Sequence, residues 1–298
     1  MADRPIPQIN YQFAPRDGHN VFREKFGHLS DDDWAKLLAR SISEPVIDGV
    51  QFPAFPEEEL QNRVHGHSGA HSIAEADGFF KFIKMHTYGS PTNAVGRRIL
   101  DFGSGWGRIL RLFMRDFDFV NIYGFEPDFL LCALARSLNP YVTFFSGDFK
   151  PTGGLPERFF DLMVGWSIFS HLSPSSATAW LTEAARVVVP GGYCVFTTWG
   201  DRFLQRLSRE THERREGKEI HWYSSVCIDA AGSINQRLSD YEKGEFVWFT
   251  AGRSILYGEA FVGEGALRTL ISQNQLPFAI KIFDKTTLDQ DAFVLRRL

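Results

Sequence analysis

The sequence predicts an α/β fold, in which helices cover both faces of a mostly parallel sheet. Two observations lead to this class. Between about residues 95 and 200, short apolar runs alternate with segments of helical periodicity, a pattern typical of parallel sheets. The first apolar run also ends in an acid, Asp101, which three glycines follow with the spacing G-x-G-x-G at 103–107. A strand, a tight glycine turn and a helix start together form the usual cofactor seat of α/β proteins.

Each predicted element follows from its local pattern. Strands are expected at residues 99–102, 120–125, 142–145, 160–167, 193–199, 246–250 and 293–298. Helices are expected from residue 109 and at 129–138, 173–188 and 263–273. Ser173 and Pro174 supply an N-cap and a first-turn proline, and Pro190-Gly191-Gly192 should end that helix. The two late strands are expected to complete the edge of the sheet.

The outer parts of the chain differ from this alternating region. Residues 1–92 are expected to form a mainly helical N-terminal extension or lid, with one short helix after Asp31-Asp32-Asp33 and a second after Ser72. Residues 93–298 should form the main domain. Within it, the charged segment at about 201–240 is expected to be a loop-rich lid insert after the fifth strand, with a solvated helical face at 209–216.

Composition excludes several classes of function. The chain has 298 residues, 44% of them hydrophobic and 23% charged, and a net charge of -4. This balance argues against nucleic-acid partners, which recruit clustered Lys and Arg. The three scattered cysteines suggest neither a disulfide framework nor a zinc site. The chain start lacks the apolar core of a signal peptide, and no apolar run reaches the roughly 20 residues that span a bilayer. We therefore expect a cytoplasmic protein without a metal, of undefined oligomeric state.

A second acid supports the interpretation of the glycine turn as a cofactor seat. The strand predicted at 120–125 leads into Glu126, and a carboxylate in this position can accept hydrogen bonds from both hydroxyls of a ribose. Asp101 suits an ammonium group, or a water that bridges to one. The glycine spacing differs from the G-x-G-x-x-G of nicotinamide enzymes, so an oxidoreductase is disfavoured.

With these acids, the glycine motif resembles the first motifs of class I S-adenosylmethionine (SAM)-dependent methyltransferases, over roughly residues 95–200. The resemblance implies a Rossmann-like seven-stranded sheet, SAM as cofactor and S-adenosylhomocysteine as product. It places an acid near the adenine after the third strand, and the exit of the fourth strand beneath the sulfonium. The residues thereby expected at the cofactor are Asp101, Gly103, Ser104, Gly105, Trp106, Glu126, Pro127, Gly147, Asp148, Phe149, Gly165, Trp166 and Ser167.

Two histidines are candidates for the general base. His171 follows the fourth strand, and imidazole titrates near neutrality and can take a proton from a hydroxyl. Ordering of its own loop is the alternative role for His171, and His221 is the second candidate base. Trp222, Tyr223 and Tyr257 are candidate walls for the acceptor, because aromatic faces stack on sugars and small heterocycles. Packing of these rings within a lid is the competing interpretation.

The acceptor itself depends on a weaker resemblance. Segments 55–61 and 288–296, with the histidine-containing turn at 63–71, resemble bacterial methyltransferases of polysaccharide and glycolipid synthesis. This implies O-methylation of a sugar or glycosylated metabolite. The alternatives are O- or N-methylation of another small metabolite, and a catalytically silent protein that binds SAM. The turn at 63–71 either folds over the SAM carboxylate or is a solvated loop.

Overall fold

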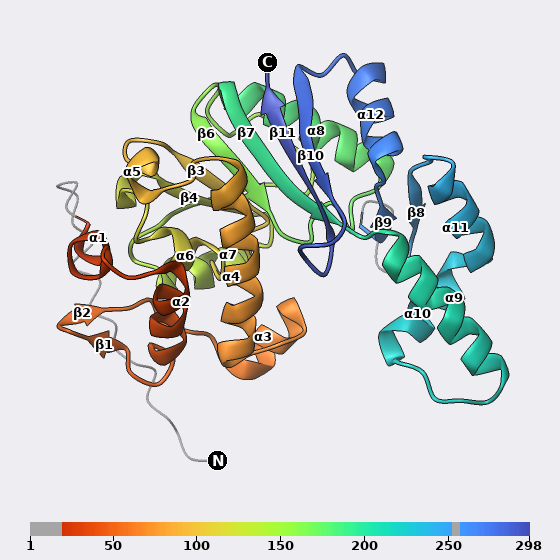
Figure 1. Ribbon diagram of the computed structural model, residues 1–298, viewed down its shortest axis with the longest axis horizontal. Helices are drawn as coiled ribbons and strands as arrows, with labels where there is room; N and C mark the ends of the chain where they lie inside the picture. The colour runs from red at the N-terminus through yellow and green to blue at the C-terminus, as the bar shows by residue number, and fades with distance from the viewer. Residues whose placement is uncertain (1–19, 252–256) are drawn as a thin grey trace.

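A central seven-stranded sheet organises the protein, as the computed structural model in Figure 1 shows. The structure describes residues 20–251 and 257–298. The strands of this sheet are β3 (Ile99–Phe102), β4 (Ile122–Glu126), β5 (Thr143–Ser146), β6 (Phe160–Gly165), β7 (Val188–Thr198), β10 (Phe278–Asp284) and β11 (Asp291–Arg297). Their order is β10-β11-β7-β6-β3-β4-β5. β11 is antiparallel to both of its neighbours, and the other pairs are parallel. The predicted mostly parallel α/β fold is confirmed.

Helices surround this sheet, and two short hairpins lie outside it. The helices are α1 (Val21–Phe26), α2 (Asp31–Arg40), α3 (Glu58–His65), α4 (Gly69–His86), α5 (Pro91–Ala94), α6 (Leu110–Phe113), α7 (Phe129–Leu138), α8 (Pro174–Val187), α9 (Asp201–Arg215), α10 (Trp222–Ala231), α11 (Ile234–Glu242) and α12 (Glu264–Gln273). The hairpins pair β1 (Val46–Ile47) with β2 (Val50–Gln51), and β8 (Val247–Phe249) with β9 (Glu259–Phe261). No helix in the described ranges is long and apolar enough to cross a membrane.

Two hydrophobic cores cover the two faces of the sheet. Ile99 of β3 and Val294 of β11 belong to the first core, which contains side chains of α1, α2, α4 and α6. Their neighbours Leu100 and Leu295 belong to the second core, with α8 and α12. Successive side chains of a strand point to opposite faces, so the apolar runs of the sequence serve both cores. The N-terminal helices therefore pack directly on the sheet.

Three local predictions are wrong. Pro190-Gly191-Gly192 does not separate α8 from the next strand, because β7 already begins at Val188 and the Pro-Gly-Gly segment lies where its register with β6 shifts. A bulge can hold a proline that a regular central strand cannot. The strand expected at 246–250 corresponds to β8, which pairs with β9 instead of the central sheet. The second late strand of the sheet is β10, which was missed because its side chains are mostly half-buried and do not alternate.

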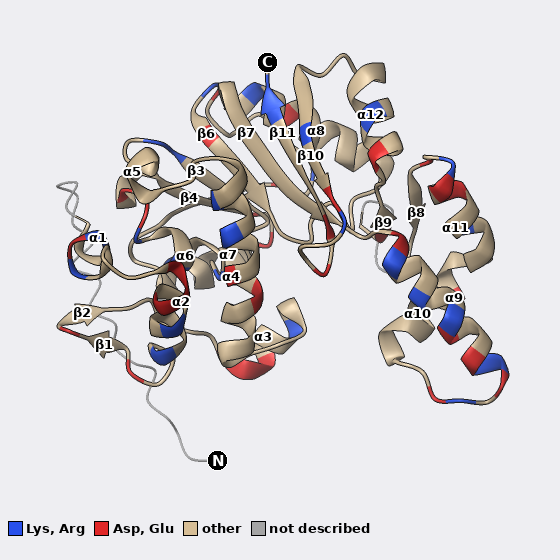
Figure 2. Ribbon diagram, viewed as in Figure 1, with Lys and Arg blue, Asp and Glu red and all other residues tan. Residues whose placement is uncertain are grey.

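The third wrong prediction is that the insert is rich in loops. It is mainly helical. α9, α10 and α11 pack with β8 and β9 around a third core, which includes Leu207, Cys227 and Phe249. Figure 2 shows Lys and Arg interspersed with Asp and Glu along α9, so this helix has a charged outer surface over an apolar inner one. The regular spacing of the apolar residues under these charges forms the helix. The insert stands beside the carboxyl end of β7 (Figure 1).

Candidate active site

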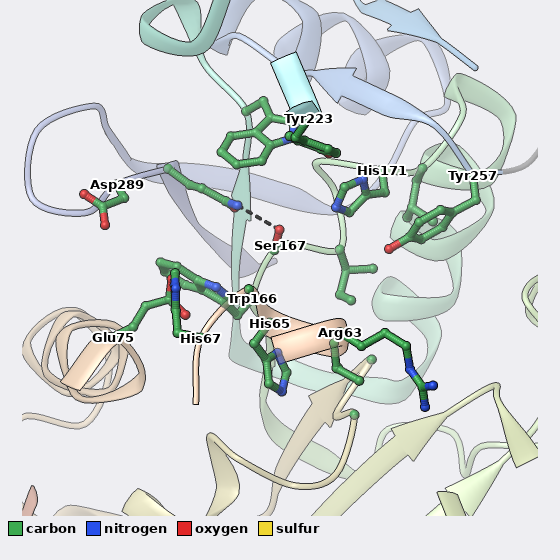
Figure 3. A pocket seen from close by; sticks show the side chains of 18 of the residues that line it. Arg63, His65, His67, Glu75, Trp166, Ser167, His171, Tyr223, Tyr257 and Asp289 are labelled. Atoms are coloured by element: carbon green, nitrogen blue, oxygen red, sulfur yellow. Dashed lines mark hydrogen bonds and ion pairs between the residues drawn. The ribbon is translucent and has the colours of Figure 1, made fainter. Parts of the chain in front are cut away.

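A cavity of about 900 Å³ lies where β3, β4, β6 and β7 end. Ligands of open α/β sheets bind at this edge, at the carboxyl ends of the strands. The end of α3 and the turn after it, the first turns of α9, the start of α10 and the loop before β11 form further parts of the wall. Figure 3 shows His171 and Tyr257 on one side of the cavity and Asp289 across from them. The volume is that of a typical small-molecule site.

The glycine turn forms the floor next to β3. Gly103 has φ +72° and Gly105 has φ +55°, a conformation that side chains other than glycine rarely adopt. The Gly105 N–H donates to Oε2 of Glu126, and the Asp128 N–H donates to Oε1, each at 2.9 Å. Glu126 therefore ties the end of β4 to the turn. Burial raises the pKa of Glu126 above its ordinary value.

Asp101 lies behind the turn, as a buried acid without a counter-charge in direct contact. Its side chain is fully enclosed, and neither carboxylate oxygen has a hydrogen-bond partner within the described residues. Burial raises the pKa of Asp101 to about 8, although the charge of Arg108 acts in the opposite direction. Such a group is costly unless a ligand donates to it.

The predicted cofactor residues divide into two groups by position. Those that line the cavity are Gly103, Gly105, Glu126, Pro127, Phe149, Trp166 and Ser167. Those outside this lining are Asp101, Ser104, Trp106, Gly147, Asp148 and Gly165. Several of the second group are structural neighbours of the first.

Packing explains the positions of most of the predicted residues that lie outside the cavity lining. Trp106 is fully buried, with its ring centroid 5.7 Å from that of His65, so it backs the cavity wall. The Ser104 hydroxyl donates to a main-chain carbonyl at 3.4 Å. Gly147 lines a separate cavity of about 60 Å³, and Asp148 is exposed. Gly165 is buried beside the main chain of β3, where a Cβ would lie 3.1 Å from the Phe102 carbonyl oxygen.

The exit of β6 is held in a strained shape. Ser167 has φ +59°, although it is not a glycine. Its N–H donates to Oγ1 of Thr197 at 2.7 Å, and its hydroxyl contacts that of Ser170 at 2.8 Å. Thr197 in turn donates to Oε1 of Gln290 at 2.7 Å. A connected set of side chains thus determines the backbone at this point of the cavity.

The His171 ring is fixed in place at the cavity wall. Its Nδ1 lies 2.8 Å from the carbonyl oxygen of Gly258, so Nδ1 donates the hydrogen bond. The ring stacks on Tyr257 with a centroid separation of 4.8 Å. The carboxylate of Glu259 is 3.6 Å from the same Nδ1. The structure thus brings His171 and Tyr257, two of the predicted site residues, into direct contact.

The predicted acceptor residues of the insert reach the same cavity. His221, Trp222 and Tyr223 all line it. His221 is also the N-cap of α10, where its Nδ1 accepts the Tyr223 N–H at 3.3 Å. Trp222 is 67% exposed, which leaves most of its ring accessible to a ligand.

Part of the wall comes from the segment 63–71, for which the sequence left open a turn over the cofactor or a solvated loop. α3 was not predicted; it ends at His65, and Gly66 at φ +79° turns the chain toward α4. His65 lies over the glycine turn, where a Cβ on Gly105 would be 3.5 Å from its Cε1. Burial lowers the pKa of His65 well below its usual value, so the ring is neutral. Its Nε2 is buried without a hydrogen-bond partner in the described part of the chain.

Other residues that line the cavity were not expected from the sequence, and they come from segments far from the glycine turn. They are Glu75, Trp199, Arg202, Phe203, Arg206, Asp289 and Gln290. Segment 288–296 stood out in the sequence, but nothing in it indicated that Gln290 reaches the exit of β6. Among residues 20–251 and 257–298, no group of three or more His, Cys, Asp or Glu side chains is placed to hold a metal ion.

Comparisons with known proteins agree with this geometry. A family model described as a methyltransferase domain matches residues 77–231. A solved structure from Pyrococcus horikoshii is similar with a TM-score of 0.53 and 15% identity, covering 82% of this chain and 99% of that one. A SAM-bound amino pentose methyltransferase from Micromonospora echinaspora, involved in calicheamicin biosynthesis, has a TM-score of 0.50 and 16% identity, covering 82% and 98%. No curated protein matches the sequence.

Proposed function

The chain belongs to the methyltransferase-domain family and is a SAM-dependent methyltransferase, and on this premise we propose that it methylates a hydroxyl group of a sugar or glycosylated metabolite. SAM supplies an electrophilic methyl group when bound. The chain must then bind the cofactor, hold the acceptor in line with that methyl group, exclude water and accept a proton. Methylation of another small metabolite, at oxygen or nitrogen, is the alternative.

The placement of His171 carries the proposal. Its Nδ1 donates to the Gly258 carbonyl, so a neutral ring has its lone pair on Nε2. A lone pair fixed in direction on a cavity wall suits removal of a proton from a hydroxyl acceptor. A neutral amine acceptor has its own lone pair and needs no such base for the attack. The fixed ring therefore favours an oxygen acceptor.

His221 is less suited to the same role. Its Nδ1 accepts the Tyr223 N–H, so the neutral ring keeps its proton on Nε2. To act as a base from Nε2 it would have to abandon the cap of α10. We therefore assign the proton transfer to His171, and to His221 a place in the acceptor wall with Trp222 and Tyr223.

Asp101 and Glu126 each have one role in binding the cofactor. Asp101 accepts from the ammonium group of SAM, which satisfies its buried oxygens. Glu126, whose oxygens each accept one backbone N–H, retains lone pairs for the ribose hydroxyls. The open backbone of Gly103 and Gly105 lets the cofactor approach the turn closely. Replacing Asp101 or Glu126 by alanine is expected to weaken SAM binding at least about tenfold in calorimetry, the loss of a charged hydrogen bond.

The acceptor wall supports a polar ring as substrate. Trp222, Tyr223 and Tyr257 offer aromatic faces, and Arg202 and Asp289 add charged hydrogen-bonding groups to the same cavity. Sugars combine apolar ring faces with hydroxyl edges, so they suit a wall of this kind. All three cysteines are free thiols, in keeping with the proposed cytoplasmic location.

Product detection tests the proposal directly. The purified protein is incubated with SAM and fractionated glycan or metabolite extracts, and mass spectrometry follows the gain of one methyl group and the formation of S-adenosylhomocysteine. We expect a methyl ether on a sugar hydroxyl, and loss of turnover in His171→Ala with unchanged SAM binding. Methylation on nitrogen would favour the alternative. SAM binding without any S-adenosylhomocysteine would identify a silent binding protein.

A further inference from the structure

We propose that Glu259 is a positioning residue for His171: its buried carboxylate stabilises the imidazolium that forms when the ring takes the acceptor proton. The inference rests on the proposed function, in which His171 is the base. Glu259 belongs to β9, which lies outside residues 77–231, the part of the chain matched by the family model.

The carboxylate is held in one orientation. Glu259 is fully buried, and its Oε2 lies 3.6 Å from His171 Nδ1. The indole Nε1 of Trp199, at the end of β7, donates to the same Oε2 at 3.1 Å. A buried charge so close to an imidazole favours the protonated ring, because the local dielectric is low and screening is weak.

The main chain fixes the distance between the two side chains. The Gly258 N–H donates to the His171 carbonyl at 2.7 Å, and the Ala260 N–H donates to the Ser170 carbonyl at 2.8 Å. Leu172 and Tyr257 form an isolated antiparallel bridge in the same place. The loop after β6 and the segment leading into β9 are thus paired like two short strands. This pairing places Glu259 next to His171.

The chemistry uses this arrangement in one step. As the acceptor oxygen forms its bond to the methyl carbon, the bond between that carbon and sulfur breaks, and the hydroxyl proton passes to Nε2 of His171. The ring then has a proton on each nitrogen and a positive charge. The hydrogen bond to the Gly258 carbonyl holds the ring in its orientation, and the carboxylate of Glu259 lowers the energy of the imidazolium. Serine hydrolases divide the work in the same way between a histidine and a buried carboxylate.

The substitution Glu259→Gln tests the charge without emptying the space. The amide can still accept from Trp199, but it carries no charge. We expect kcat to fall at least about tenfold, a part of the 10²–10⁴-fold typical of general-base catalysis. The KM for the acceptor and the Kd for SAM should change less than about twofold, because Glu259 does not line the cavity. Glu264→Gln on the exposed first turn of α12 is the matched control, and its kcat should not change.

A second readout needs no acceptor. Glu259 and Tyr257 are titratable groups that face the His171 ring. Ring ¹⁵N shifts of His171 report its proton occupancy, and we expect the midpoint of their titration in Glu259→Gln to move down by about one pH unit. Glu259→Asp keeps the charge and should retain the wild-type midpoint. It also serves if Glu259→Gln does not fold.

Failure of this inference differs from failure of the proposed function. An unchanged midpoint and an unchanged kcat in Glu259→Gln would make Glu259 a purely structural residue. A wild-type protein that methylates nothing would reject the proposed function, while the ¹⁵N titration would still decide whether Glu259 acts on His171.

Discussion

The side-chain amide of Gln290 donates a hydrogen bond to Oγ of Ser167 at 2.7 Å, across 123 positions of sequence. Gln290 also accepts from the Thr197 hydroxyl, so it joins the loop before β11 to the strained exit of β6. Figure 3 shows Ser167 at the centre of the cavity wall, at the end of this hydrogen bond. The shape of the acceptor side therefore depends on a residue close to the last strand of the sheet.

Removing this bridge should destabilise the fold. In Gln290→Ala the buried hydroxyl of Thr197 and the half-buried hydroxyl of Ser167 lose a partner, so the free energy of unfolding should fall by about 1–3 kcal/mol. Urea denaturation measures the difference. Gln273→Ala, on the exposed side of α12, is the control and should stay within about 0.5 kcal/mol of wild type. Equal stability of the two variants would show that the bridge contributes nothing.

Gly103 is a second site where backbone shape limits the side chain. It has φ +72°, and a Cβ there would lie 2.2 Å from Cδ1 of Ile168. In Gly103→Ala, Ile168 must move and the turn is strained, so SAM affinity should fall at least about tenfold in calorimetry, in addition to about 1–2 kcal/mol of backbone strain. Gly153→Ala has similar strain at φ +77° but nothing within 4 Å. It should lose stability and keep SAM affinity; the same loss of affinity in both would reject a local effect.

The raised pKa of Asp101 gives the stability a pH dependence of known sign. The folded value of about 8 lies above the ordinary 3.8, so between these values the folded state holds a proton that the unfolded chain releases. The contribution of Asp101 therefore decreases as pH rises from about 4 to about 8, by at most about 1.4 kcal/mol per pH unit. Asp101→Asn should flatten this slope in urea denaturation from pH 5 to 8. The exposed Asp148→Asn should leave it unchanged.

The same proton should appear in cofactor binding. An ammonium group beside Asp101 favours the ionised carboxylate, so SAM binding at pH 7 should release about one proton. Calorimetry in two buffers with different ionisation enthalpies counts this proton. In Asp101→Asn the release should be absent. Equal release by both proteins would place the ammonium group elsewhere.

Trp222 should separate acceptor binding from folding. Its ring is 67% exposed in the cavity wall, so Trp222→Ala removes a contact surface without opening the core. We expect the KM for the acceptor to rise about tenfold, which corresponds to the loss of one aromatic stacking contact. The free energy of unfolding should stay within about 0.5 kcal/mol of wild type. Met85→Ala, on α4 and 74% exposed, is the control. An unchanged KM in Trp222→Ala would remove this ring from the acceptor site.

The parts of the fold that could be predicted are those with local causes. The apolar run that ends at Phe102 predicts the strand. The spacing of the glycines, which can adopt positive φ, predicts the turn after it. Ser173 caps α8 as expected, accepting from the Ser176 N–H. β10 and the pairing of β8 with β9 could not be predicted, because the partner of a short strand is decided by tertiary packing.

The candidate site shows the same division. Glu126 and the exit of β6 could be predicted, because strand ends meet at one edge of a parallel sheet. His65 belongs to the segment 63–71 that the sequence marked as a turn over the cofactor or a solvated loop, but its place at the end of α3 was missed because α3 was not predicted. Glu259 and Gln290 were missed because their positions depend on how β9 and β11 dock, over distances of 60 residues or more from their partners Trp199 and Ser167.

The walls of the cavity include residues as far apart as His65 and Gln290. The complete cavity exists only when both regions are folded. A cofactor bound in it therefore stabilises both regions together, as a non-covalent cross-link would. By mass action, SAM at 100 times its Kd adds about 2.7 kcal/mol to the free energy of unfolding. Because the cavity is lost when either region opens, that increment applies to both of them. Amide exchange should therefore slow together in α3 and in β11 when SAM binds, although neither segment belongs to the glycine turn.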